Sequence, residues 1–319
     1  MKVHRMNVAW ASSHALRRAR CSAVMFAIVL CMVAVPGLAA AQEPSSYENA
    51  YAELKAKAHE QGGQDGGHAG LQGFYDAHFA AVIAGSTLTQ LPQKDLIAIF
   101  QAAYYVAFFT PDDAHLRDMQ KAFDALEQRH LAGTTEATHM YEAYFQARHF
   151  DDMARFRAAH PTEPLEAPTR LASKASPFGS HRMLKVVDAS TVEAQGVDLS
   201  TGAHIVVIGN PGCHFTQWAV EAIEHDPALG AVFNGHAVWL SPADGNIDLA
   251  PFAAWNKAHP ATRIDLVGTE AGWPEVGAWQ TPTFLFFKDG RVVDRVIGWP
   301  KEGSAAAVEA GWAKANGQA

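Results

Sequence analysis

Cysteine is scarce in this chain, which holds three among its 319 residues. Two of them, Cys21 and Cys31, lie within the first 41 residues, and Cys213 is the one that follows. Thr216 occupies the position where a paired redox site would hold a second cysteine. The composition therefore excludes an internal disulfide beyond residue 41 and leaves a single thiol to carry any sulfur chemistry.

Basic residues are also few relative to acidic residues, 25 against 33. Five of the basic residues and none of the acidic ones fall in residues 1–41, so the remainder of the chain has a formal net charge of −13. Such an excess of negative charge argues against nucleic acid or an anionic membrane surface as a partner.

Several catalytic and cofactor motifs are missing. The chain has no glycine-rich phosphate loop and no Ser-His-Asp nucleophile elbow. Its 16 histidines form no helical His-x-x-x-His pair with an acidic residue between them. Cys213 and His214 alone are too few ligands for a structural metal. We therefore expect neither a metal nor a cofactor.

Residues 1–41 have the pattern of a secretory signal peptide. Arginines cluster at 17–20, an apolar run covers 22–38, and three alanines at 39–41 offer a cleavage site. An uncleaved anchor is the alternative, because the apolar run approaches the length that spans a bilayer. The pattern predicts a protein that is soluble after cleavage and is periplasmic or secreted, where a lone thiol is unusual.

Residues 42–160 are predicted to form an all-α helical-hairpin domain. Apolar residues recur at helical spacing, and the predicted helices cover 93–109, 112–131, 134–148 and 150–160. The last two would form a hairpin that resembles one tetratricopeptide-type unit, the helical repeat. The glycine-rich stretch 61–67 is expected to be a loop. Residues 161–182, with four prolines and no periodicity, are expected to be a linker.

Residues 183–319 are predicted to form an α/β domain, because short β-rich runs alternate with helical segments. The predicted strands cover 184–187, 204–208, 237–240, 264–267, 283–287 and 292–297, and the predicted helices cover 216–225, 249–259, 273–279 and 304–315. Asp289-Gly290 between the last two strands is a strong hairpin signal.

The strand at 204–208 runs through Pro211-Gly212 into a helix that opens near Cys213, and Thr281-Pro282 stands just before the hairpin. In these features, residues 183–319 resemble the thioredoxin superfamily, in particular periplasmic thioredoxins of the TlpA and ResA kind. The resemblance implies a thioredoxin-like fold in which Pro282 is a cis-proline facing Cys213. It also implies that the Thr281 backbone is exposed to pair with an extended substrate strand.

The sequence departs from that family at three places. Thr216 replaces the resolving cysteine, and Pro211-Gly212 replaces the aromatic residue that often precedes the first cysteine. Val207 stands about where a buried carboxylate often helps to deprotonate the second cysteine. Losing that carboxylate and that cysteine together is chemically consistent, because the base would have nothing left to deprotonate.

Cys213 is expected at a helix N-terminus, where free N–H groups and the helix dipole lower the pKa of a thiol. Thr216, on the same helical face, would either donate to the sulfur or cap the helix. His214 would add positive charge only if its ring turned toward the sulfur, since adjacent helical residues point apart. A buried, inert cysteine is the structural alternative.

Aromatic residues of this region divide into two predicted groups. Trp218, Trp239, Trp255 and the run 284–287 are expected in the core. Trp273, Trp279 and Trp299 fall in predicted turns near the thiol, where they would either line a substrate groove or pack inside.

Together these patterns predict a thioredoxin-like protein with one reactive thiol that exchanges with disulfides of partner proteins or small thiols. Cys213, Thr216 and Pro282 are the predicted catalytic residues, and Thr281, Pro211, Gly212 and His214 are the predicted substrate contacts. An external resolving thiol would release the mixed disulfide. The alternatives are a non-catalytic module that binds peptides with its thioredoxin-like groove and helical hairpins, or a single-cysteine peroxidase.

Overall fold

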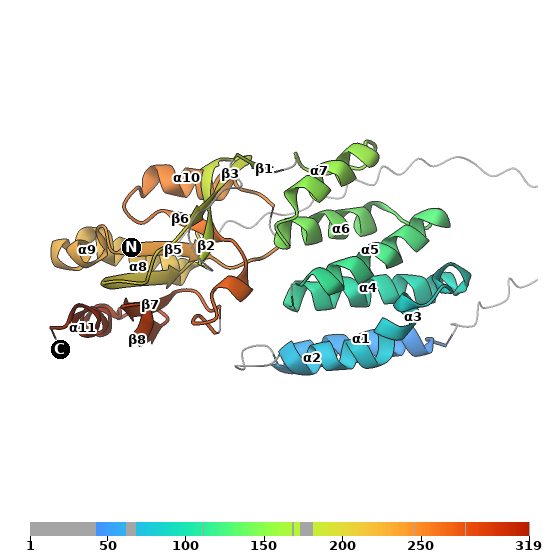
Figure 1. Ribbon diagram of the computed structural model, residues 1–319, viewed down its shortest axis with the longest axis horizontal. Coiled ribbons are helices and arrows are strands. Elements are labelled where there is room, and N and C mark those ends of the chain that lie inside the picture. Colours follow the sequence, from blue (N-terminus) through green and yellow to red (C-terminus); the bar gives the residue numbers. More distant parts are fainter. Residues whose placement is uncertain are drawn as a thin grey trace, which may run out of the picture. The chain divides into compact units, whose positions relative to one another are not determined.

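The computed structural model describes residues 43–61, 68–110, 112–167, 169–172, 181–245, 247–277 and 279–318. The predicted signal peptide at 1–41 and nearly all of the predicted loop at 61–67 lie outside the described residues. Residues 44–319 form one compact unit. Figure 1 shows its helices and strands.

The N-terminal part of this unit is helical. Its helices are α1 (Ser46–Gln61), α2 (His68–Tyr75), α3 (Ala81–Ala84), α4 (Gln93–Phe109), α5 (Asp113–Gln128), α6 (Thr134–Gln146) and α7 (Phe150–Ala159), with a π-helical turn at Asp76–Ala80 and a 3-10 turn at Leu88–Gln90. The four predicted helices are confirmed as α4 to α7, with the end of α5 three residues earlier than expected.

Helix α5 illustrates how the sequence specifies these elements. Asp112 caps the helix by accepting a hydrogen bond from the backbone N–H of His115 at 2.8 Å. Leu116, Met119 and Phe123, spaced three and four residues apart, are all buried. The helix ends before His130, which takes a left-handed conformation with φ of 56°.

The C-terminal part is built on one sheet of eight strands, in the order β1-β3-β2-β6-β5-β4-β7-β8. The strands are β1 (Arg170–Leu171), β2 (Arg182–Asp188), β3 (Thr191–Gly196), β4 (Ala203–Ile208), β5 (Ala237–Ser241), β6 (Ile264–Val267), β7 (Thr283–Lys288) and β8 (Arg291–Ile297). Strands β4, β5 and β6 are mutually parallel, whereas β7 and β8 form an antiparallel hairpin beside β4.

The central strands bury side chains on both faces of the sheet, because successive side chains of a strand point to opposite faces. Ile205 and Val207 of β4 belong to the core that also holds apolar residues of the helices α8 (His214–His225), α9 (Pro227–Phe233), α10 (Ala250–Ala258) and α11 (Ala305–Asn316). Val206 and Ile208 face a second, smaller core with Trp273 and Val276. Helix α10 contacts β2 and β6, and α11 contacts β4, β7 and β8 (Figure 1).

Strand direction brings three chain segments to one edge of the sheet. Because β4 and β5 are parallel, with Ile208 opposite Leu240, both strands end there. Because β7 is antiparallel to β4, with Thr283 opposite Ile208, β7 begins there. The segments that follow β4, follow β5 and precede β7 are therefore neighbours, although they lie far apart in the sequence.

Several elements differ from the predictions. Strand β3 was not predicted, because its segment Thr191–Gly196 holds few apolar residues and owes its conformation to pairing with β2. Helix α9 was not predicted either, although Asp226 caps that helix and Pro227 opens it. Residues 161–182 are not free of regular structure, because β1 pairs with β3 and β2 begins at Arg182.

The predicted helix at 273–279 is wrong. The described residues of that segment, 273–277 and 279, form no helix, and a short 3-10 turn at Glu270–Gly272 lies just before them. Trp273 is 1% exposed, and its indole N–H donates to the backbone oxygen of Arg182 at 2.9 Å. A buried tertiary contact therefore sets the conformation of this segment.

The helical part contacts the same edge of the sheet through the end of α6. The buried amide of Gln146 donates to the backbone oxygens of Phe108 at 2.8 Å and of Ala243 at 3.2 Å. Arg148 donates through Nε to the backbone oxygen of Val267 at 3.2 Å. Burial lowers the pKa of Arg148 to about 10 and raises the pKa of the neighbouring Glu270 to about 7.

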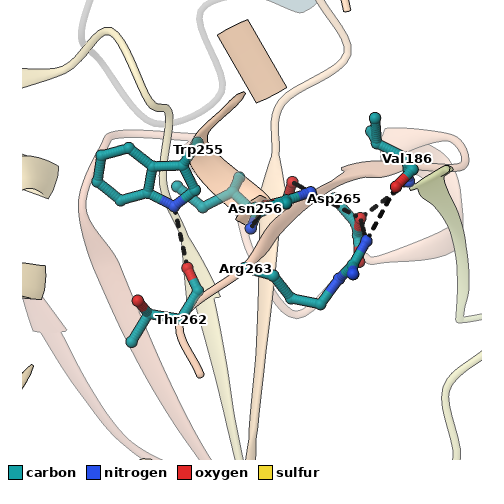
Figure 2. Close-up of polar contacts among 7 residues, drawn as sticks. Val186, Trp255, Asn256, Thr262, Arg263 and Asp265 are labelled. Carbon is teal, nitrogen blue, oxygen red and sulfur yellow. Dashed lines mark hydrogen bonds and ion pairs between the residues drawn. The ribbon is translucent and has the colours of Figure 1, made fainter. Parts of the chain in front are cut away.

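Asp265 joins β6 to β2 and to the turn after α10. Its carboxylate is 2% exposed and accepts hydrogen bonds from the backbone N–H of Val186 at 2.9 Å and from Arg263 at 2.7 and 2.9 Å. Arg263 also donates to the backbone oxygen of Val186 at 3.0 Å, and Asn256 lies beside the carboxylate (Figure 2). The buried charge is thus paired and hydrogen-bonded, as burial of a carboxylate demands.

Among the described residues, no helix combines the length and the apolar character needed to cross a membrane.

The Asp265 network predicts a large cost for removing its carboxylate. We expect Asp265→Ala to lower the free energy of unfolding by about 2–4 kcal/mol, because it leaves the Val186 N–H and the Arg263 guanidinium without their partner. The matched control is Asp294→Ala, which removes a pair with Lys314 at the surface and should cost about 0–1 kcal/mol. Urea titrations of both variants measure the difference, and equal costs would contradict this role of Asp265.

Candidate functional site

Cys213 lies at the N-terminal cap position of α8, at the edge of the sheet where β4 ends. Its backbone N–H donates to the oxygen of Asn210 at 3.0 Å, and its own oxygen accepts from the N–H of Gln217 at 3.0 Å. The side chain is partly exposed and forms no disulfide. The residue is thus partly exposed, and the alternative of a fully buried cysteine is wrong.

Groups around the sulfur favour its ionised form. Burial raises the pKa of the Cys213 thiol, but hydrogen bonding by the Thr281 side chain, by the N–H and hydroxyl of Thr216 and by the N–H of Phe215 outweighs it. The pKa is therefore held below its ordinary value, as expected of a thiol over the free N–H groups of a helix N-terminus.

Thr281 acts on both protonation states of Cys213. The backbone oxygen of Thr281 lies 3.5 Å from Sγ and accepts a hydrogen bond from the protonated thiol. The side chain of the same residue favours the thiolate. The thiolate is the form more strongly stabilised, because a thiol S–H that donates across 3.5 Å makes only a weak hydrogen bond, whereas the bonds to the anion are charge-assisted.

Thr216 is completely buried beneath the sulfur. Its methyl group lies against the backbone at Gly209, where an added Cβ would come within 3.1 Å of it. Its hydroxyl accepts from the N–H of Asn210 at 3.4 Å and stabilises the Cys213 thiolate. Of the two roles left open by the sequence, the direction of the Cys213 pKa shift favours stabilisation of the sulfur, because no side-chain hydrogen bond caps α8.

The segment before β7 supplies the other wall of the site. The Thr281–Pro282 peptide bond is cis, and Pro282 is buried. The N–H of Gly298 donates to the oxygen of Pro282 at 2.7 Å, and the hydroxyl of Thr283 donates to the oxygen of Gln280 at 2.8 Å. These bonds hold the Thr281 carbonyl beside the sulfur, 68 residues away in the sequence.

The three predicted substrate contacts next to Cys213 differ in their exposure. Pro211 is buried, and its oxygen accepts from the side-chain amide of Gln217 at 2.7 Å. Gly212 and His214 are exposed. The ring of His214 lies against Phe215 and Trp218, with centroids 3.9 and 5.1 Å away, rather than over the sulfur.

Exposed aromatic side chains follow Cys213 on α8. Phe215 and Trp218 are 40% and 38% exposed, and their rings lie 5.5 Å apart. The prediction that Trp218 belongs to the core is therefore wrong. Trp273 and Trp299 are buried instead of lining a groove. Residue type alone misplaced Trp218, because its helical phase relative to the buried Thr216 puts it on a different face of α8.

Two further residues at the site were not predicted. Asn210 hydrogen-bonds through its side chain to the N–H of Gly212 at 2.8 Å and to the hydroxyl of Ser241 at 3.2 Å. An asparagine two residues before a glycine in a Pro-Gly turn is a recognised turn signal, so Asn210 could have been found from the sequence. Ser241 could not, because only the register of β4 against β5 brings it near.

Within the described ranges, no group of three or more histidine, cysteine, aspartate or glutamate side chains is arranged to hold a metal ion.

Comparisons of the chain with protein-family models, with curated proteins and with solved structures found no match. The chemistry of the site must therefore be argued from its own geometry.

The Thr216 hydroxyl provides a direct test of the electrostatics. Thr216→Val keeps the shape of the buried side chain and removes a hydrogen bond to the thiolate, so the pKa of Cys213 should rise. We expect the rate of alkylation by iodoacetamide at pH 6 to fall about threefold to tenfold, which corresponds to ~1 kcal/mol. The control is Thr262→Val, a buried threonine that donates to Glu224. Equal rates in the two variants would exclude this role of Thr216.

Proposed function

We propose that residues 183–319 form a thioredoxin-like domain and that the protein exchanges disulfides through the single thiol of Cys213. The observation that supports this most strongly is a partly exposed sulfur at the start of α8 with a lowered pKa and the Thr281 oxygen 3.5 Å away. The cis peptide before Pro282 and the hairpin β7–β8 that follows it are the other features that the family resemblance implies.

The proposed reaction is a thiol–disulfide exchange in two steps. The Cys213 thiolate attacks one sulfur of a partner disulfide, so that a mixed disulfide forms, the partner S–S bond breaks and the departing thiolate takes a proton from water. A second thiolate from solution or from another protein then attacks the mixed disulfide. Cys213 leaves as thiolate, and a new disulfide forms between the partner sulfur and the external thiol.

The external thiol is required because Thr216 stands where an internal resolving cysteine would be. Val207, where a carboxylate would assist such a cysteine, is completely buried among apolar side chains. The proposed substrates are disulfides of partner proteins or of small thiols. The proposed location is the periplasm or the extracellular medium, where such disulfides persist after removal of a signal peptide at 1–41.

A second candidate function is peptide binding without chemistry. The observation that favours it is the exposure of Phe215 and Trp218 beside the thiol, because exposed aromatic side chains are enriched in binding surfaces. In this case the helical region at 42–160 would present a further surface to the partner. Covalent trapping at Cys213 separates the two functions.

The trapping experiment compares the parent protein with a variant that carries a second thiol at position 216. Cys21 and Cys31 are replaced by serine, and the protein is mixed with a peptide disulfide. We expect a mixed disulfide to accumulate on Cys213 and to persist until a thiol is added. With Thr216→Cys, one helical turn away on the same face, the adduct should instead resolve by itself within the assay, as mass spectrometry would show.

The matched control is Thr262→Cys, which adds a thiol elsewhere in the same fold. Its adduct on Cys213 should persist as in the parent protein. If no adduct forms on Cys213 in the parent protein, the exchange reaction is excluded and peptide binding becomes the better account.

A further inference from the structure

Asn210 connects the end of β5 to the turn and to the helix start that hold the thiol. Its amide Nδ2 donates to the hydroxyl of Ser241 at 3.2 Å, and its Oδ1 accepts from the N–H of Gly212 at 2.8 Å. Its backbone N–H donates to the Thr216 hydroxyl at 3.4 Å, and its backbone oxygen accepts from the N–H of Cys213 at 3.0 Å. One residue thus joins the end of β5, the turn and the first turn of α8.

The N–H of Gly212 fixes how the amide of Asn210 is turned, and Ser241 accepts from the other end of that amide. Ser241 is the last residue of β5 and is completely buried. With Nδ2 on the Ser241 oxygen, Oδ1 faces the N–H of Gly212. In the opposite orientation the amide NH₂ would face that N–H, donor against donor, so only the observed orientation satisfies both contacts.

The turn leaves no space for an alternative arrangement. An added Cβ at Gly212 would lie 3.2 Å from Oδ1 of Asn210, closer than ordinary contact. The bond from the Gly212 N–H to Oδ1 holds the Pro211–Gly212 peptide, and the bond from the Cys213 N–H to the Asn210 oxygen holds the peptide that leads into Cys213. The orientation of that peptide decides whether the sulfur lies over the N–H groups of Phe215 and Thr216.

We propose that Asn210, held by Ser241 and by the N–H of Gly212, is a positioning residue for Cys213. This inference rests on the proposed function, since it concerns the same sulfur. Asn210 does not touch the sulfur and acts through the turn. Its loss should therefore weaken the stabilisation of the thiolate even when the protein remains folded.

The test compares Asn210→Ala with Asn256→Ala. Asn256 forms the same kind of paired contact, with the backbone oxygen and N–H of Ile264 at 3.0 and 2.7 Å, but at the opposite end of the parallel strands. We expect Asn210→Ala to move the pH midpoint of Cys213 alkylation upward, with a rate at pH 6 about threefold lower. Asn256→Ala should lower the thermal unfolding temperature without moving the midpoint.

Ser241→Ala is the second variant, and it tests the proposal even if Asn210→Ala fails to fold. It should move the midpoint in the same direction, and the double variant should move it no further than Asn210→Ala alone, because the two residues act as a unit. A midpoint unchanged in both single variants would overturn the positioning role. That result would leave the proposed exchange reaction intact, because the exchange is judged separately by adduct formation in the parent protein.

Discussion

Contact between the Cys213 sulfur and the first turn of α8 is the interaction on which the site depends. The N–H groups of Phe215 and Thr216 have no partners within the helix, and a sulfur placed over them gains stability as an anion. Burial opposes this effect, so the pKa of Cys213 depends on the geometry of the hydrogen bonds to its sulfur. The surrounding structure holds the sulfur and these N–H groups in that geometry.

The sheet brings the residues of the site together. Parallel β4 and β5 end at one edge, and antiparallel β7 begins there, which places Asn210, Ser241 and Thr281 around one sulfur. The residues that hold the turn are neutral, so they orient the thiol without competing for its charge. Gln146 and Arg148 attach the helical region to the same edge, at the ends of β5 and β6.

Local patterns in the sequence predicted much of this arrangement. Long periodic segments such as 93–109 gave helices with correct bounds, and Asp289-Gly290 marked the hairpin. The Pro-Gly turn before Cys213 indicated a thiol at a helix start. The errors arose where tertiary contacts decide the conformation. Strand β3 depends on pairing with β2, Trp273 on a bond to Arg182, and Ser241 reaches the site only through strand register.

The central claim is that the fold holds Cys213 more readily ionised than a free cysteine. Ultraviolet absorbance of the thiolate measures this without any reagent, as the difference between the parent protein and Cys213→Ser across a pH titration, with Cys21 and Cys31 replaced by serine in both. The account predicts a midpoint below that of free cysteine, ~8.5. A midpoint at or above that of free cysteine would contradict it.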